Sequence, residues 1–286
     1  MPLLEKFDAA GQLKSGLGHV GKDPTSVVFD RLNSATEGVV EGRKTILAGT
    51  NNYLGLTFDP DCIAAGVAAM QSWGTGTTGS RMANGSYAAH GALEAELADL
   101  YQCSSAMVFS TGYAANLGVL TALLGKGDAV LLDSDAHASL YDGCRMSEAD
   151  IYRFKHNDVK SLERRIARLG DRARRCLIIV EGVYSVLGDR APMKEIAEIK
   201  ERYRARLLVD EAHSLGVFGE RGCGVAEEQG VLDKVDFTVG TFSKSLGAMG
   251  GFCASQHDVL GLFRYVSRPF MFTASPSPAV MATTRE

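Results

Sequence analysis

The 286-residue chain carries a formal net charge of −4 and is 45% apolar, as expected of one large globular domain with smaller pieces. Its acidic and basic residues are interspersed, which argues against a nucleic-acid footprint or a polybasic membrane patch. The six cysteines are scattered, and neither a signal peptide nor a transmembrane run is present, so we expect a cytoplasmic protein without disulfides, zinc or another bound metal.

The first 57 residues predict an N-terminal segment with an amphipathic helix, a loop at residues 16–24 and a short strand at residues 45–48. After Pro60, helical periodicity alternates with short apolar runs. This alternation is typical of an α/β fold whose mostly parallel sheet has helices on both faces. The predicted helices span residues 61–73, 87–101, 112–124, 158–169 and 192–203. The predicted strands span residues 106–109, 129–132, 176–180, 206–209, 235–239 and 251–254.

Six arginines cluster in the fourth predicted helix and in the segment between it and the strand at 176–180, at positions 164, 165, 168, 172, 174 and 175. Glu163 and Asp171 interrupt the run, so we interpret it as a solvated helix face and loop.

Polar segments follow five of the predicted strands. In parallel sheets ligands bind at the carboxyl ends of the strands, so these segments are expected to meet around one site. They are residues 110–112, 133–137, 181–185, 210–213 and 241–244.

Lys244, Asp210 and His213 form a set suited to pyridoxal 5'-phosphate (PLP). The lysine amine can bond to the aldehyde, the buried carboxylate can hold a protonated pyridine nitrogen, and the histidine can bond the phenolic oxygen. The competing interpretations are a solvated lysine, and a carboxylate paired with an arginine or a helix N-terminus. A Walker-B interpretation of Asp-Glu-Ala-His fails because no phosphate-binding P-loop precedes it.

The run Ser110-Thr111-Gly112-Tyr113 opens a predicted helix, where backbone N–H groups favour an anion such as phosphate. Thr241 and Ser243 could add hydroxyl donors. An ordinary N-cap with a tight turn is the alternative.

His137 has two interpretations. It could be a surface histidine, or its flat ring could stack on a planar cofactor; its position after a strand favours stacking.

Residues 74–79 match the Gly-x-Gly-x-x-Gly dinucleotide fingerprint in letters only. They follow a predicted helix rather than a strand, and a second glycine turn, Asn84-Gly85, comes where the phosphate-binding helix should run. We therefore expect a structured loop near the active site.

Taken together, eight segments resemble the α-oxoamine synthase family of fold-type I PLP enzymes, and within it the serine-using branch. They span residues 49–56, 79–85, 109–116, 135–143, 181–189, 209–216, 240–247 and 268–275.

The resemblance implies a seven-stranded, mostly parallel sheet in a PLP-binding large domain at residues 58–268, after an N-terminal segment at 1–57. Residues 269–286 would begin a C-terminal region. Family members continue for roughly another hundred residues as a small domain, which carries the arginine that binds the substrate carboxylate. We therefore expect this chain to lack that domain and to show weak or no turnover.

The resemblance also assigns the catalytic positions. Lys244 would carry the Schiff base and act as the base for the Cα proton, while His137 would stack on the ring. Asp210 would hold the pyridine nitrogen, and His213 and Ser185 would contact the phenolic oxygen.

Further binding positions follow from the same resemblance. Gly112, Tyr113 and Thr241 would bind the phosphate, and Thr273 would reach the phosphate of the neighbouring subunit, because family active sites form in a shared homodimer interface. Asn51 would lie near the amino-acid carboxylate.

The implied activity is a decarboxylative condensation of an amino acid, L-serine, with a long-chain acyl thioester, palmitoyl-CoA or an acyl carrier protein. The product would be a 3-ketosphinganine-type aminoketone, in the first step of sphingolipid synthesis. The alternatives are an aminotransferase, a glycine- or alanine-using synthase of the 2-amino-3-ketobutyrate CoA ligase or 8-amino-7-oxononanoate synthase type, and a non-catalytic partner subunit.

Overall fold

The structure, a computed structural model, describes residues 3–19 and 24–286 and divides into two units, Met1–Thr50 and Asn51–Glu286. The first unit contains helix α1 (Asp8–His19) and an antiparallel sheet of β1 (Phe29–Leu32), β2 (Glu37–Val40) and β3 (Arg43–Ile46). The two-residue turn between β2 and β3 has positive φ at Glu41 and Gly42, as a tight hairpin requires. The predicted loop at 16–24 is wrong at its start because α1 continues through His19; residues 20–23 lie outside the described residues.

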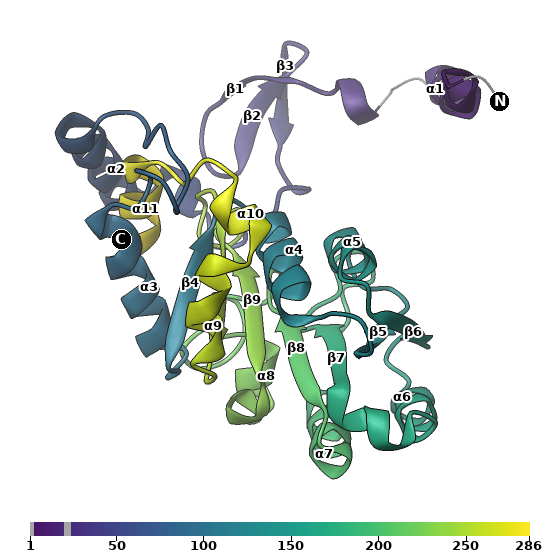
Figure 1. Cartoon of the computed structure of the whole chain (residues 1–286). Helices are drawn as coiled ribbons and strands as arrows, with labels where there is room; N and C mark the ends of the chain where they lie inside the picture. Colours follow the sequence, from purple (N-terminus) through teal and green to yellow (C-terminus); the bar gives the residue numbers. More distant parts are fainter. Residues whose placement is uncertain (1–2, 20–23) are drawn as a thin grey trace. The chain divides into compact units, whose positions relative to one another are not determined.

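The second unit is built on a seven-stranded sheet in the order β4-β10-β9-β8-β7-β5-β6 (Figure 1). Strand β10 is antiparallel to both neighbours, and the other pairings are parallel. The predicted fold class, a mostly parallel seven-stranded sheet, is confirmed. The strands are β4 (Ser105–Phe109), β5 (Ala129–Asp133), β6 (Asp150–Phe154), β7 (Cys176–Glu181), β8 (Arg206–Asp210), β9 (Phe237–Thr241) and β10 (Gly251–Ser255).

Helices connect these strands and follow them. The longer ones are α2 (Pro60–Trp73), α3 (Ala88–Leu100), α4 (Gly112–Leu123), α5 (Ala138–Met146), α6 (Val159–Ala167), α7 (Met193–Tyr203) and α11 (Pro278–Arg285). Single-turn helices are α8 (Val225–Glu228), α9 (Val259–Leu262) and α10 (Arg268–Met271). All five predicted helices are present, with ends within two residues of the prediction.

The central strands are buried on both faces, and their side chains alternate between two hydrophobic cores. On β5, Leu131 enters the core that also contains residues of α6 and α7. Its neighbours Val130 and Leu132 enter the core formed with α4 and α5. Because side chains alternate along a strand, an unbroken apolar run supplies both cores, which is why these strands were predictable.

Strand β6 and helix α5 were not predicted. Strand β6 forms one edge of the sheet, and its residues Asp150 and Arg153 are exposed, so the sequence contains no apolar run there. Helix α5 has only nine residues, too few for clear periodicity. Strand β9 begins two residues later than predicted, which places Thr241 at its end.

All six cysteines are free. Among residues 3–19 and 24–286, no helix combines the length and the hydropathy that a membrane crossing needs.

Candidate active site

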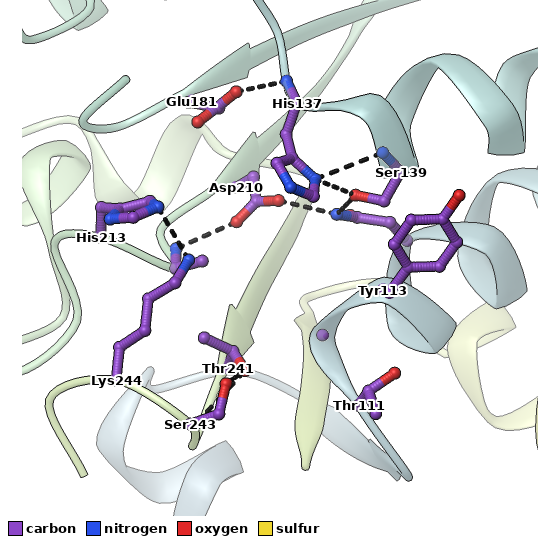
Figure 2. Close-up of a pocket in the computed structure, with 13 residues that line it drawn as sticks. Thr111, Tyr113, His137, Ser139, Glu181, Asp210, His213, Thr241, Ser243 and Lys244 are labelled. Atoms are coloured by element: carbon purple, nitrogen blue, oxygen red, sulfur yellow. Dashed lines mark hydrogen bonds between the residues drawn. The ribbon is translucent and has the colours of Figure 1, made fainter. Parts of the chain in front are cut away.

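A cavity of about 240 Å³ lies at the carboxyl ends of β7, β8 and β9 (Figure 2). The loops after β4 and β5 complete its wall. It is lined by Thr111, Gly112, Tyr113, Asn116, His137, Ser139, Glu181, Asp210, Ala212, His213, Thr241, Ser243 and Lys244. Three of the five predicted strand-end segments thus contribute two or more lining residues, and the segments after β5 and β7 contribute His137 and Glu181 alone.

Asp210, the last residue of β8, is a buried carboxylate at the base of the cavity. Its oxygens accept hydrogen bonds from the Asn116 side chain (Nδ2 to Oδ2, 2.7 Å) and from the Ala212 backbone N–H (2.9 Å). No cationic side chain among the described residues forms an ion pair with it, so its charge is held by amide donors alone and would be stabilised by a cation in the cavity.

Glu181 ends β7 and is the register partner of Asp210 across the two strands. Burial, followed by the nearby charge of Asp210, raises the pKa of Glu181 to about 8. The raised pKa means that Glu181 carries a proton near neutral pH, and a cation bound in the cavity would lessen the effect of the neighbouring Asp210 charge.

Lys244 Nζ lies 2.8 Å from His213 Nε2, and His213 Nδ1 lies 2.6 Å from the Tyr53 hydroxyl. That hydroxyl in turn lies 3.1 Å from Asn51 Oδ1. All three contacts are satisfied when Lys244 donates to Nε2, the Nδ1–H donates to Tyr53, and Tyr53 donates to Asn51.

The shifted pKa values of His213 and Lys244 favour an uncharged imidazole beside an amine that loses its proton readily. Burial and the charge of Lys244 lower the pKa of His213 to about 4. Burial also lowers the pKa of Lys244, although the charges of Asp210 and Glu181 oppose the shift. A lysine with a lowered pKa is a competent nucleophile.

The start of α4 forms an anion cradle. Thr111 caps the helix by accepting from the Ala114 N–H at 3.0 Å, which leaves the N–H groups of Gly112 and Tyr113 without an acceptor among the described residues. A Cβ on Gly112 would lie 2.9 Å from the Thr241 side chain, so only glycine allows this close approach. The geometry suits phosphate.

Two hydroxyls face this cradle from the end of β9. The Thr241 hydroxyl already donates to the Gly250 carbonyl at 2.8 Å. Ser243 Oγ lies 2.9 Å from Thr241 Oγ1 and donates to it, because the Thr241 proton is taken by Gly250; a rotation of the Ser243 hydroxyl would turn this proton toward a ligand.

His137 caps α5 and is fixed from two sides. Its ring Nδ1 lies 2.7 Å from Ser139 Oγ, and its backbone N–H donates to Glu181. The Tyr113 ring meets it edge-on, with 6.4 Å between centroids. The imidazole is thus held rigidly against the cavity, as a stacking role needs.

Three predicted site residues do not line the cavity. Ser185 is exposed on the loop after β7. Asn51 is linked to the site through Tyr53, whose hydroxyl donates to Asn51 Oδ1. Thr273 lies on the segment after α10, and its hydroxyl donates to the carbonyl of Pro269 within that helix.

Asn116, Ser139 and Glu181 line the cavity but were not predicted as site residues. Each lies in a segment that was singled out, yet the sequence does not reveal that Asn116, more than a helical turn into α4, faces Asp210 on β8. The available signal was burial: a polar residue inside an apolar helix needs a partner.

Two other features lie outside the cavity. Residues 74–79 form a loop held by Ser275, whose N–H donates to the Gly79 carbonyl at 3.0 Å, and they do not line the site. Asp133, Asp135 and His156 lie close enough to share a cation. Asp133 and Asp189 already bond both nitrogens of the His156 ring, so we assign this group a structural role.

Comparisons with known proteins agree with this geometry. Residues 43–286 match the family model "Aminotransferase class I and II". The chain is 57% identical to a serine palmitoyltransferase of Caulobacter vibrioides over 99% of this chain and 70% of that protein. A solved Sphingomonas wittichii serine palmitoyltransferase superposes with a TM-score of 0.96 at 51% identity, over 99% of this chain and 71% of that one.

A third relative is a solved serine palmitoyltransferase described as carrying PLP as its internal aldimine. Its TM-score is also 0.96, at 49% identity and with the same coverage of both chains. The predicted resemblance is confirmed: the chain belongs to the aminotransferase class I and II family of fold-type I enzymes and, within it, to the α-oxoamine synthases.

Proposed function

We propose that this chain binds PLP and condenses L-serine with a long-chain acyl thioester, palmitoyl-CoA. Carbon dioxide and the thiol leave, and the product is a 3-ketosphinganine-type aminoketone, the first intermediate of sphingolipid synthesis. The observation that carries the proposal is the convergence of Lys244, Asp210 and His137 on one cavity. The relatives named serine palmitoyltransferase support the choice of substrates.

The residues present fit PLP. The carboxylate of Asp210 lacks a cationic partner, which a protonated pyridine nitrogen would provide. The N–H groups of Gly112 and Tyr113, with Ser243, would hold the phosphate, and His137 would cover the ring face. When bound, PLP supplies an aldehyde that reacts with amines and a ring that withdraws electrons from the amino-acid Cα.

Lys244 has two tasks in this proposal. Its amine, with a lowered pKa, is the nucleophile that attaches the cofactor. The same amine, when unprotonated, would also be placed to accept the Cα proton of an amino acid bound in the cavity. His213, 2.8 Å away and uncharged, positions that amine without competing for the proton.

Several parts of the proposal extend beyond the cavity. Ser185 would contact the phenolic oxygen, Asn51 the substrate carboxylate, and Thr273 the phosphate of a second subunit. A homodimer is supported by the exposed apolar side chains of Met82 and Phe272. The six free cysteines support a cytoplasmic location.

Absorbance spectroscopy tests the proposal without requiring turnover. Protein mixed with PLP should gain a band near the visible edge, and L-serine should shift that band at lower concentration than glycine or L-alanine. A colourless protein in excess PLP would exclude the enzyme and favour a non-catalytic partner. A stronger response to glycine or L-alanine would instead assign the chain to the glycine- or alanine-using synthases.

The protonation state of Lys244 predicts how the rate of covalent PLP attachment depends on pH. Only the unprotonated amine attacks an aldehyde, so the rate of covalent PLP attachment should rise with pH and level off below about 10.4, the ordinary lysine pKa. Tyr53→Phe removes the acceptor of the His213 Nδ1–H, which weakens Nε2 as an acceptor for the charged amine and moves the plateau to still lower pH. Stopped-flow absorbance across pH measures both plateaus. An unchanged plateau in the variant would refute the assigned hydrogen-bond direction.

A further inference from the structure

A second cavity, the basic pocket, lies at the carboxyl end of the edge strand β6. Its volume is about 540 Å³, within the range of small-molecule sites. Helix α6 forms one wall, beside β6 in Figure 1. The pocket is lined by Ser134, Arg153, Phe154, Lys155, His156, Ser161, Arg164, Arg165 and Arg168.

The charges in the basic pocket are uncompensated. Four arginines and Lys155 line it with no carboxylate, and none of the five makes an ion pair with a described residue. Nearby arginines behave differently: Arg172 pairs with Asp150, and Arg175 pairs with Asp128. Arg164, Arg165 and Arg168 are exposed on α6, as the solvated-face interpretation of the arginine run predicts, and they line this pocket as well.

Helical spacing concentrates this charge. Arg164 and Arg168 are four residues apart and Arg165 and Arg168 three apart, so all three lie on one side of α6. Like charges at this spacing destabilise a helix, and a bound anion would reverse that cost. Arginine is also the side chain best suited to phosphate, through paired N–H donors.

Two serine hydroxyls add neutral donors. Ser161 Oγ accepts from the Lys155 N–H at 3.2 Å, and Ser134 Oγ accepts from the His156 N–H at 3.1 Å. Neither hydroxyl proton is donated to a described residue, so both are available to a ligand. Ser161 is buried, which makes it a fixed part of the pocket rather than a mobile surface group. His156 is engaged with Asp133 and Asp189, so we assign it no ligand role.

The basic pocket and the Lys244 cavity both include residues at the carboxyl ends of strands in the same sheet. Strands β8, β7, β5 and β6 are successive parallel neighbours, so the end of β6 lies three strand spacings, about 14 Å, from Asp210. We propose that the basic pocket binds the phosphate groups of the nucleotide end of acyl-CoA, while the thioester reaches the Lys244 cavity. The ligand's identity rests on the proposed function; the anion site itself does not.

Isothermal titration with free CoA and with dephospho-CoA, which lacks the 3'-phosphate, tests the proposal on the PLP-loaded protein. Wild type should bind CoA more tightly. The double variant Arg164→Gln/Arg168→Gln should lose about 10- to 100-fold in CoA affinity and most of the preference for the 3'-phosphate. The control Arg174→Gln/Lys194→Gln removes the same charge from exposed positions outside the pocket and should bind CoA as wild type does.

Other outcomes would overturn the proposal. If the two double variants bind CoA with the same affinity, whether that affinity is unchanged or equally weakened, a specific site is excluded. If vesicles of anionic phospholipid retain wild type but not the pocket variant while CoA affinity is unchanged, the pocket serves a lipid surface instead. The PLP absorbance should be the same in all three proteins. Its absence would refute the proposed function while leaving pocket-dependent CoA binding as an independent result.

Discussion

Lys244→Ala should keep the fold and lose the covalent attachment of PLP. The side chain is half-buried at the cavity, 2.8 Å from His213, and no other lysine lines that cavity. The band near the visible edge should vanish, and borohydride reduction followed by peptide mass spectrometry should find modified Lys244 in wild type alone. Exchange of the L-serine Cα proton with deuterated water, followed by NMR, should slow by about 10²- to 10⁴-fold because the base is absent.

Lys244→Arg is the matched control for charge. It keeps a cation near Asp210 and Glu181 but provides no amine for the aldehyde. We expect it to resemble Lys244→Ala in both assays. A retained visible band in either variant would mean that a different lysine attaches the cofactor, and the site assignment would fail.

Asp210→Asn should weaken PLP binding by about 10- to 100-fold, since a charge-assisted hydrogen bond contributes about 1.5–3 kcal/mol. The amide keeps the shape of the carboxylate but not the charge that holds the ring nitrogen protonated. Cα-proton exchange should therefore also slow at saturating PLP. Equilibrium titration of PLP absorbance gives the affinity, and the NMR assay gives the exchange rate.

Glu181→Gln provides the comparison, because it makes the same carboxylate-to-amide change at the neighbouring strand end. The pKa of Glu181 is already raised to about 8, so this residue carries a proton near neutral pH and its replacement should change PLP affinity much less. If Glu181→Gln were the more damaging change, Glu181 rather than Asp210 would be the partner of the ring.

The sequence predicted the structure best for strands that are buried on both faces of the sheet. The apolar runs of β5, β7 and β8 and the polar residues that end them were predictable, because such strands place their carboxyl ends at one edge. Strand β6 was missed because an edge strand has one neighbour and exposed polar residues.

Contacts between distant segments could not be predicted. The bond from Asn116 to Asp210 joins residues 94 apart, and the pairing of Tyr53 with His213 joins residues 160 apart. Each depends on which strands are neighbours and on side-chain direction, and neither leaves a periodic pattern. The basic pocket was hidden similarly, since three of its arginines were visible as a run but Arg153 and Ser134 come from other segments.

The order of the strands has a consequence for how the protein can be monitored. Asp210 ends β8 and Lys244 follows β9, whereas His137 follows β5, which is separated from β8 by β7. Exchanging two central strands would leave the helix and strand content unchanged but would move a site residue by about 4.8 Å, more than a hydrogen bond can bridge. Cofactor colour would thus report chain topology during refolding, which circular dichroism cannot distinguish.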